Sequence, residues 1–311
     1  MSMGPAGDVA RSTVRPNSET TRPTPMRTFL HTDDGVTIDS VYDPSAVVYD
    51  SSRPPVRDLV FVVAHGFTGD VDRPHVRRVA QALTRHAAVI TFSFRGHGAS
   101  GGRSTVGDKE VLDLAAAVRW ARELGHTRVA TIGFSMGGSV VLRHAALYGE
   151  DGGGDRDGRD GRDGGGGEEL GTTPGAHGGR GAHTDAVVSV SAPARWYYRG
   201  TPRMRRLHWL VTRPEGRLVG RYGFRTRIHH RDWNPVPMSP VEAVPRIAPT
   251  PLLIVHGELD GYFPLDHPRM LAHAAGDHGE LWLEPGMGHA EHAASEELLA
   301  RIGGWAAARG G

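Results

Sequence analysis

Hydrophobic residues in this chain occur in two alternating patterns, which together predict a sheet of parallel strands joined by helices. Short uninterrupted apolar runs are typical of strands buried on both faces, and they occupy 59–64, 88–94, 128–132, 186–191 and 251–255. Between them, apolar residues recur at the three- and four-residue spacing of amphipathic helices, first in a helix expected to begin at Pro74. Because parallel neighbours need such crossover connections, the predicted fold class is α/β with a mostly parallel central sheet flanked by helices.

The ends of the chain extend this pattern. Segments 27–31 and 36–42 predict a hairpin around the turn at Gly35. A last short strand is expected at 280–283, followed by a closing amphipathic helix that contains Leu298, Leu299, Ile302 and Trp305. In the middle of the chain, Asp108 is expected to cap the helix that carries Val111.

Three segments depart from the alternation. Residues 1–25 are polar and rich in proline, serine, threonine and arginine, and we interpret them as a disordered leader before a single domain over 26–311. Within that domain, 149–185 is a flexible insertion rich in glycine, aspartate and arginine, which cannot bury enough apolar surface to order itself. Residues 193–249 contain many prolines and little helical periodicity, and predict a short irregular segment that covers the site as a cap.

The composition of the chain excludes several kinds of functional site but does not identify the function. The chain has 311 residues, a formal net charge of +1 and no cysteine, which excludes disulfides, thiolate metal sites and cysteine nucleophiles. No apolar run approaches the about 20 residues that span a bilayer, and no secretory signal is evident, so we expect a cytoplasmic protein without stable membrane insertion. No His-Glu-x-x-His or comparable ligand spacing occurs, so neither a metal nor another cofactor is expected.

The segment from Gly133 to Gly137 is the strongest candidate for chemistry, because it reads Gly-x-Ser-x-Gly between a predicted strand and a predicted helix. Glycines on either side of Ser135 suit a sharp turn that forces the serine into strained backbone angles. Such a turn lifts the hydroxyl clear of the sheet, at a helix start whose first amides have no internal partner.

Two other loops also follow predicted strands, and they contain Asp260 and His289. Because the carboxyl ends of parallel strands share one edge of a sheet, these residues can converge on Ser135. A serine hydroxyl becomes a nucleophile when an imidazole takes its proton, and a carboxylate holds that imidazole in one tautomer. Glu258 and Asp266 remain alternatives to the aspartate, and His292 is an alternative to the histidine.

The sequence resembles the α/β-hydrolase superfamily, most closely its esterase, monoacylglycerol-lipase-like and serine-aminopeptidase-like branch. The resemblance rests on five motifs in order, which are His65-Gly66-Phe67, Arg95-Gly96-His97-Gly98-Ala99-Ser100, Gly133-Phe134-Ser135-Met136-Gly137-Gly138, His256-Gly257-Glu258-Leu259-Asp260 and Gly286-Met287-Gly288-His289. It implies that Ser135 is the nucleophile, His289 the general base and Asp260 the orienting carboxylate. It also implies an oxyanion hole formed by the backbone N–H groups of Phe67 and Met136.

The resemblance predicts a serine hydrolase that cleaves carboxylic esters of small molecules through an acyl-enzyme. Thioester and small-amide or peptide hydrolysis would use the same machinery. A non-catalytic binding protein on the same fold is a further alternative. Nucleic-acid binding is not expected, because the nearly neutral chain contains no recognisable motif for it.

The segment 195–231 bears on the substrate, because it contains eleven arginines and one glutamate with aromatic residues between them. One interpretation is a solvated cap whose arginines meet the acidic insertion or water. The other is an entrance selective for anionic or amphiphilic acyl substrates, or one that rests on lipid headgroups.

Overall fold

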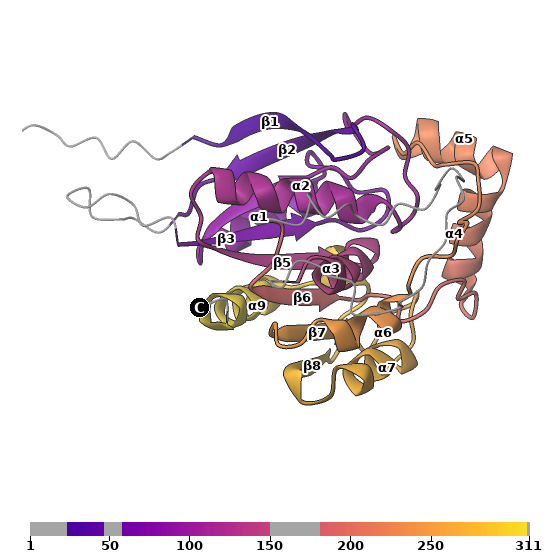
Figure 1. Cartoon of the computed structure of the whole chain (residues 1–311). Coiled ribbons are helices and arrows are strands. Elements are labelled where there is room, and N and C mark those ends of the chain that lie inside the picture. The colour runs from indigo at the N-terminus through magenta and orange to yellow at the C-terminus, as the bar shows by residue number, and fades with distance from the viewer. Residues whose placement is uncertain (1–23, 47–57, 150–180, 310–311) are drawn as a thin grey trace, which may run out of the picture.

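A single eight-stranded sheet forms the centre of the protein (Figure 1). The computed structural model describes residues 24–46, 58–149 and 181–309. The strands lie in the order β1-β2-β4-β3-β5-β6-β7-β8. Their bounds are β1 Met26–His31, β2 Thr37–Asp43, β3 Leu59–Ala64, β4 Ala88–Phe92, β5 Arg128–Phe134, β6 Ala186–Val190, β7 Leu252–Gly257 and β8 Gly279–Glu284. The predicted terminal hairpin is confirmed, since β1 and β2 pair in antiparallel fashion, as do β2 and β4, and all other pairs are parallel.

Helices cover both faces of the sheet. They are α1 Pro74–Leu83, α2 Glu110–Glu123, α3 Met136–Leu147, α4 Pro202–Thr212, α5 Pro214–Gly223, α6 Pro240–Ala243, α7 Asp266–Ala275, α8 Ala290–Ala293 and α9 Glu296–Arg309. Two 3₁₀ turns, η1 Val244–Arg246 and η2 Gly276–His278, follow α6 and α7. None of the helices in these described ranges is long and apolar enough to cross a membrane.

Side chains alternate between the two faces of each strand, so the sheet has one layer of hydrophobic core on each face. Along β3, Val60 and Val62 pack with α2, α3 and α7 on one face. Phe61 and Val63 pack with α1 and α9 on the opposite face. Successive strand side chains point to opposite faces, so a strand buried on both must be apolar throughout. This is why the uninterrupted apolar runs predicted the parallel part of the sheet correctly.

The segment 193–249 is more regular than predicted. It contains α4 and α5, which stand apart from the layers at one end of the sheet (Figure 1). Two of the many prolines that suggested irregular chain, Pro202 and Pro214, are each the first residue of a helix, where the missing N–H has no partner to lose. Thr201 caps α4 by accepting a hydrogen bond from the N–H of Met204 at 3.2 Å. The prediction of irregular chain was therefore wrong for residues 202–223, where prolines that begin helices were interpreted as helix breakers.

A second correction concerns the start of α2. Asp108 does not cap this helix, which begins at Glu110. The hydroxyl of Thr105 instead accepts a hydrogen bond from the N–H of Lys109 at 2.8 Å, while the side chain of Asp108 lies 3.5 Å from that of Arg143. The predicted leader 1–25 and insertion 149–185 lie outside the described residues, apart from 24–25, 149 and 181–185.

Candidate active site

Ser135 occupies a sharp turn between β5 and α3. Its backbone angles are φ 52° and ψ −113°, in the left-handed region that a serine seldom adopts. A Cβ at Gly137 would overlap the carbonyl oxygen of Ala64, and one at Gly133 would overlap the carbonyl oxygen of Gly137. The turn is this tight because only hydrogen atoms occupy these two positions, as the Gly-x-Ser-x-Gly spacing predicted.

The structure brings Ser135, His289 and Asp260 together in one continuous chain of hydrogen bonds. The Nε2 atom of His289 lies 2.9 Å from the Ser135 hydroxyl oxygen. Its Nδ1 atom lies 2.7 Å from Oδ2 of Asp260. The imidazole side chain is 13% exposed and the carboxylate 1% exposed, so the serine end of the chain is its open end. Each residue follows a different strand, namely β5, β7 or β8.

Asp260 is held as an ionised acceptor. Its Oδ1 atom accepts hydrogen bonds from the backbone N–H groups of Tyr262 at 2.7 Å and Phe263 at 3.1 Å. Burial alone would raise the pKa of Asp260, but the hydrogen bond from His289 and these two amides together lower it below its usual range. The carboxylate therefore keeps its charge and fixes the Nδ1–H tautomer of His289.

His256 lies behind this carboxylate and was not singled out from the sequence. Its Nε2–H group donates to the carbonyl oxygen of Phe263 at 2.9 Å, and Nε2 lies 3.7 Å from Oδ2 of Asp260. Burial lowers the pKa of His256, so the ring is neutral beside the charged aspartate. The ring braces the turn that carries Asp260, and its only sequence signal was its position in the motif after β7.

The alternative residues lie elsewhere. Glu258 is exposed to solvent, and Asp266 forms an ion pair with Arg195 at 2.9 Å. The ring of His292 packs against that of His75 at a tilt of 41°, with 3.9 Å between the ring centroids. Among the described residues, Asp260 is thus the carboxylate that contacts His289.

The loop after β3 brings Phe67 to the same place. His65 is buried and locks this loop, because it bonds to the carbonyl oxygen of Gly66 at 2.7 Å through Nδ1 and accepts the N–H of Phe94 at 3.0 Å through Nε2. Burial lowers the pKa of His65 to about 3, which keeps the ring neutral. In the described part of the chain, the backbone N–H groups of Phe67 and Met136 donate no hydrogen bond to a protein acceptor. Both residues line the pocket that contains Ser135.

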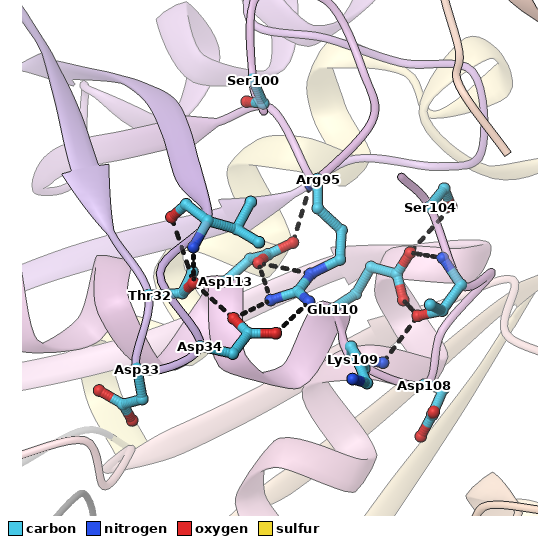
Figure 2. A network of polar contacts seen from close by, with 12 residues as sticks. Thr32, Asp33, Asp34, Arg95, Ser100, Ser104, Asp108, Lys109, Glu110 and Asp113 are labelled. Atoms are coloured by element: carbon cyan, nitrogen blue, oxygen red, sulfur yellow. Dashed lines mark hydrogen bonds and ion pairs between the residues drawn. The ribbon is translucent and has the colours of Figure 1, made fainter. Parts of the chain in front are cut away.

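A buried ionic network fixes the loop after β4 (Figure 2). Arg95 donates through Nε to Asp113 at 2.9 Å and through Nη1 to Asp34 at 2.7 Å, while its backbone N–H donates to Asp113 at 2.8 Å. Burial alone would lower the pKa of Arg95, but the two carboxylates outweigh it and raise the pKa. A few residues on, the carboxylate of Glu110 accepts the hydroxyls of Ser104 and Thr105 at 2.8 and 2.6 Å.

The same loop carries the base of the cap. Isolated β-bridges join His97 to Thr226 and Ser104 to Ile228. The segment that follows α5 is therefore attached to a loop that the Arg95 network holds rigidly. The Arg-Gly-His-Gly motif thus serves here as the anchor of the cap, a role that its sequence did not reveal.

A pocket of about 710 Å³ opens above Ser135, between the sheet edge and α4. Its apolar wall comes mainly from the cap segment and includes Phe67, Trp196, Tyr197, Tyr198, Met204, Leu207, Val211, Trp233 and Phe263. The rings of Trp196 and Trp233 pack with their centroids 5.1 Å apart. Charged groups also line the pocket, namely Arg195, Arg199, Arg217, Arg231 and Asp232. The site can accept a hydrophobic, partly aromatic group next to the serine, with cationic groups within reach.

Comparison with known proteins agrees with this architecture. The sequence profile of the alpha/beta hydrolase fold matches residues 60–152. No curated protein matches the chain. Among solved structures, the esterase Pf2001 of Pyrococcus furiosus has 20% sequence identity and a TM-score of 0.62, with 93% of each chain covered.

Two further solved structures are similar. The alpha/beta hydrolase GrgF from Penicillium sp. sh18 has 16% identity and a TM-score of 0.62, with 93% of this chain and 99% of that chain covered. Est1E from Butyrivibrio proteoclasticus, solved with ferulic acid bound, has 17% identity and a TM-score of 0.52, with 89% and 96% covered. The chain therefore has the α/β-hydrolase fold, as its motifs predicted, and its structural neighbours include esterases.

Proposed function

We propose that the protein is a serine hydrolase that cleaves carboxylic esters. The observation that carries the proposal is the unbroken chain of hydrogen bonds from Asp260 through His289 to Ser135. A serine in an ordinary strand-to-helix turn needs neither a strained backbone nor an imidazole with a dedicated carboxylate. That combination is the arrangement that activates a hydroxyl for attack on a carbonyl carbon.

The reaction follows from this geometry. The oxygen of Ser135 attacks the ester carbonyl while Nε2 of His289 takes the hydroxyl proton. The same imidazole then protonates the departing alcohol, which leaves an acyl group on Ser135. Water attacks this acyl-enzyme by the same steps, and the serine is released. Throughout, Asp260 stabilises the imidazolium that forms at His289.

The charge that develops on the carbonyl oxygen needs its own partners. The N–H of Met136 lies at the start of α3, where the first amides of a helix have no internal acceptor. Together with the N–H of Phe67, it forms the proposed oxyanion hole. Losing one such donor costs about 3 kcal/mol of transition-state stabilisation. Because both donors belong to the backbone, Met136→Ala is expected to reduce the rate far less than a substitution at Ser135.

The pocket suggests which esters to test first. Its wall is aromatic, and no ion pair with a carboxylate is found for Arg199, Arg217 or Arg231 within the described ranges. We propose acyl or alcohol groups that are bulky, apolar and in part anionic, with the negative charge directed toward these arginines. The ferulic acid bound to Est1E, an aromatic carboxylic acid, is of the same chemical class.

Labelling with a fluorophosphonate probe tests the nucleophile. Ser135→Ala is expected to lose labelling and to lower the turnover of p-nitrophenyl butyrate by about 10⁴-fold or more, while the fold stays intact. Ser40→Ala provides a matched control, because Ser40 is buried in β2 and its hydroxyl has no hydrogen-bond partner among the described residues. Full activity in Ser135→Ala would refute the assignment.

Substrate panels distinguish the remaining alternatives. Rates on matched esters, thioesters and aminoacyl amides rank the three reactions that this machinery supports. A folded protein that neither labels at Ser135 nor turns over any of them would favour the non-catalytic binding function. To test the pocket, the specificity constants of matched neutral and anionic aromatic esters are measured at increasing salt concentrations, both for the parent protein and for Arg199→Gln. If neither salt nor the substitution changes these specificity constants, the proposed preference for anionic substrates is wrong.

A further inference from the structure

Three possible metal ligands from distant parts of the sequence meet outside the active site. His75 lies at the start of α1, while Glu291 and His292 lie in α8. One ligand atom from each of the three lies within 4.8 Å of the others. The two rings are tilted by 41° with their centroids 3.9 Å apart, and Nε2 of His75 lies 3.9 Å from Oε1 of Glu291.

Among the described residues, the buried carboxylate of Glu291 has no ion pair with a lysine or an arginine. Its side chain is only 4% exposed. It accepts the backbone N–H of Gly66 at 2.9 Å, but within the described ranges no lysine or arginine forms an ion pair with it. Burying a carboxylate without a cationic partner is costly. A cation bound between Glu291 and the two imidazoles would supply that charge.

The two histidines differ in a way that suits binding. His75 is half-buried, so the residues packed around it hold its ring in place. His292 is exposed, and its side chain can turn without disturbing the core.

We propose that His75, Glu291 and His292 bind a divalent transition metal ion, for which Zn²⁺ is the first choice. Two imidazoles and one carboxylate form a donor set that zinc, nickel and cobalt accept, whereas magnesium and calcium favour oxygen alone. Ligand atoms around a tetrahedral zinc ion lie about 3.3 Å apart, from bonds of about 2.0 Å. The present spacing therefore has to contract, and the exposed side chain of His292 provides that movement.

An ion here would act on the oxyanion loop through Glu291. The carboxylate that would bind the metal also accepts the N–H of Gly66, the residue before Phe67. The metal would thus cross-link α1, α8 and the loop after β3, and stabilise the native protein by mass action. The sequence could not indicate this site, because its ligands come from elements at opposite ends of the chain.

Metal titration of the full-length, chelator-treated protein tests the site. Zn²⁺ at about 100 times its dissociation constant is expected to raise the unfolding midpoint by about 5 °C. Co²⁺ is the spectroscopic probe, since it produces visible absorption bands when nitrogen and oxygen ligands bind it. His292→Ala and His75→Gln are expected to weaken Co²⁺ binding at least about tenfold and to reduce the thermal shift at the same metal concentration by about half or more.

Two control variants separate this site from other imidazoles. His229→Ala/His230→Ala removes the stacked pair in the cap, whose centroids lie 5.1 Å apart, and His289→Asn removes the imidazole beside Ser135. Both are expected to bind Co²⁺ as the parent protein does. The proposal is overturned if the parent protein gives no Co²⁺ bands, if His292→Ala gives the same bands, or if either control abolishes them. Because His292 is exposed, its variant is expected to fold, and circular dichroism without metal checks this.

Discussion

The helix behind Ser135 and the helices of the cap line the same pocket, yet they are built in opposite ways. In α3, ten of twelve residues are buried. In α4, two of eleven are buried, and in α5 two of ten, while large apolar side chains such as Leu218 and Tyr222 are 57% and 75% exposed. The hydrogen-bonded residues Ser135, His289 and Asp260 thus belong to the closely packed layers, and most of the pocket wall belongs to a loosely attached cap. Substitutions in the first region should therefore affect folding, and those in the second should affect binding.

Removing the cation of the buried network should have the largest effect. Arg95→Ala leaves Asp113 and Asp34 without their partner, and breaking a buried pair in this way costs about 3–5 kcal/mol of unfolding free energy. Urea denaturation measures the loss. Arg195→Ala is the control, since its ion pair with Asp266 joins two side chains that are 47% and 46% exposed. Equal losses in the two variants would contradict the contrast between the rigid layers and the cap.

A leucine pair tests the same contrast without charge. Leu142 in α3 is fully buried, and Leu142→Ala should lower the unfolding free energy by about 2–5 kcal/mol through lost contacts and a cavity. Leu218 in α5 is largely exposed, and Leu218→Ala should change the unfolding free energy by less than about 0.5 kcal/mol. Thermal and urea unfolding of both proteins provide the comparison. A costly Leu218→Ala would show that the cap is packed more firmly than its burial indicates.

Two glycine-to-alanine substitutions, one in the turn that carries Ser135 and one far from it, test how tightly that turn is packed. Gly137→Ala places a methyl group against the backbone of Ala64 and His65, and overpacking of this kind costs about 1–3 kcal/mol. It should also displace Ser135 and reduce fluorophosphonate labelling. Gly304→Ala in α9 has open space around the new methyl group and should be neutral or stabilise the protein by up to about 1 kcal/mol. Unchanged labelling in Gly137→Ala would indicate that the turn tolerates movement.

At neutral pH the smallest expected effect concerns His144 in α3, because its ring changes the stability only as the pH falls. This buried ring has no hydrogen-bond partner among the described residues, and burial lowers its pKa to about 3. Between the unfolded value near 6.5 and about 3, only the unfolded chain takes up the proton, so stability falls as pH falls. His144→Phe removes this contribution and should flatten the stability profile by about 1.4 kcal/mol per pH unit between pH 6 and 4. Parallel profiles in urea denaturation would show that the ring is protonated in the folded protein.

Several features could be predicted because each has a local cause. The strands followed from apolar runs, and the turn at Ser135 followed from the glycines that a Cβ would exclude. Asp260 and His289 were singled out because loops after parallel strands share one edge. The structure brings both to Ser135, although their catalytic roles remain a proposal. The cap helices were missed because the prolines at their first positions resemble helix breakers when the chain is read without its contacts.

The sequence by itself determined the alternation of strands and helices, the sharp turn and the order of the three candidate residues. These depend on backbone sterics and on side-chain periodicity, which act over a few residues. Only the tertiary structure decided that the Arg95 loop anchors the cap, that His256 braces Asp260, and that His75 meets Glu291 and His292. Those contacts join distant parts of the chain, and their geometry exists only after the layers have packed.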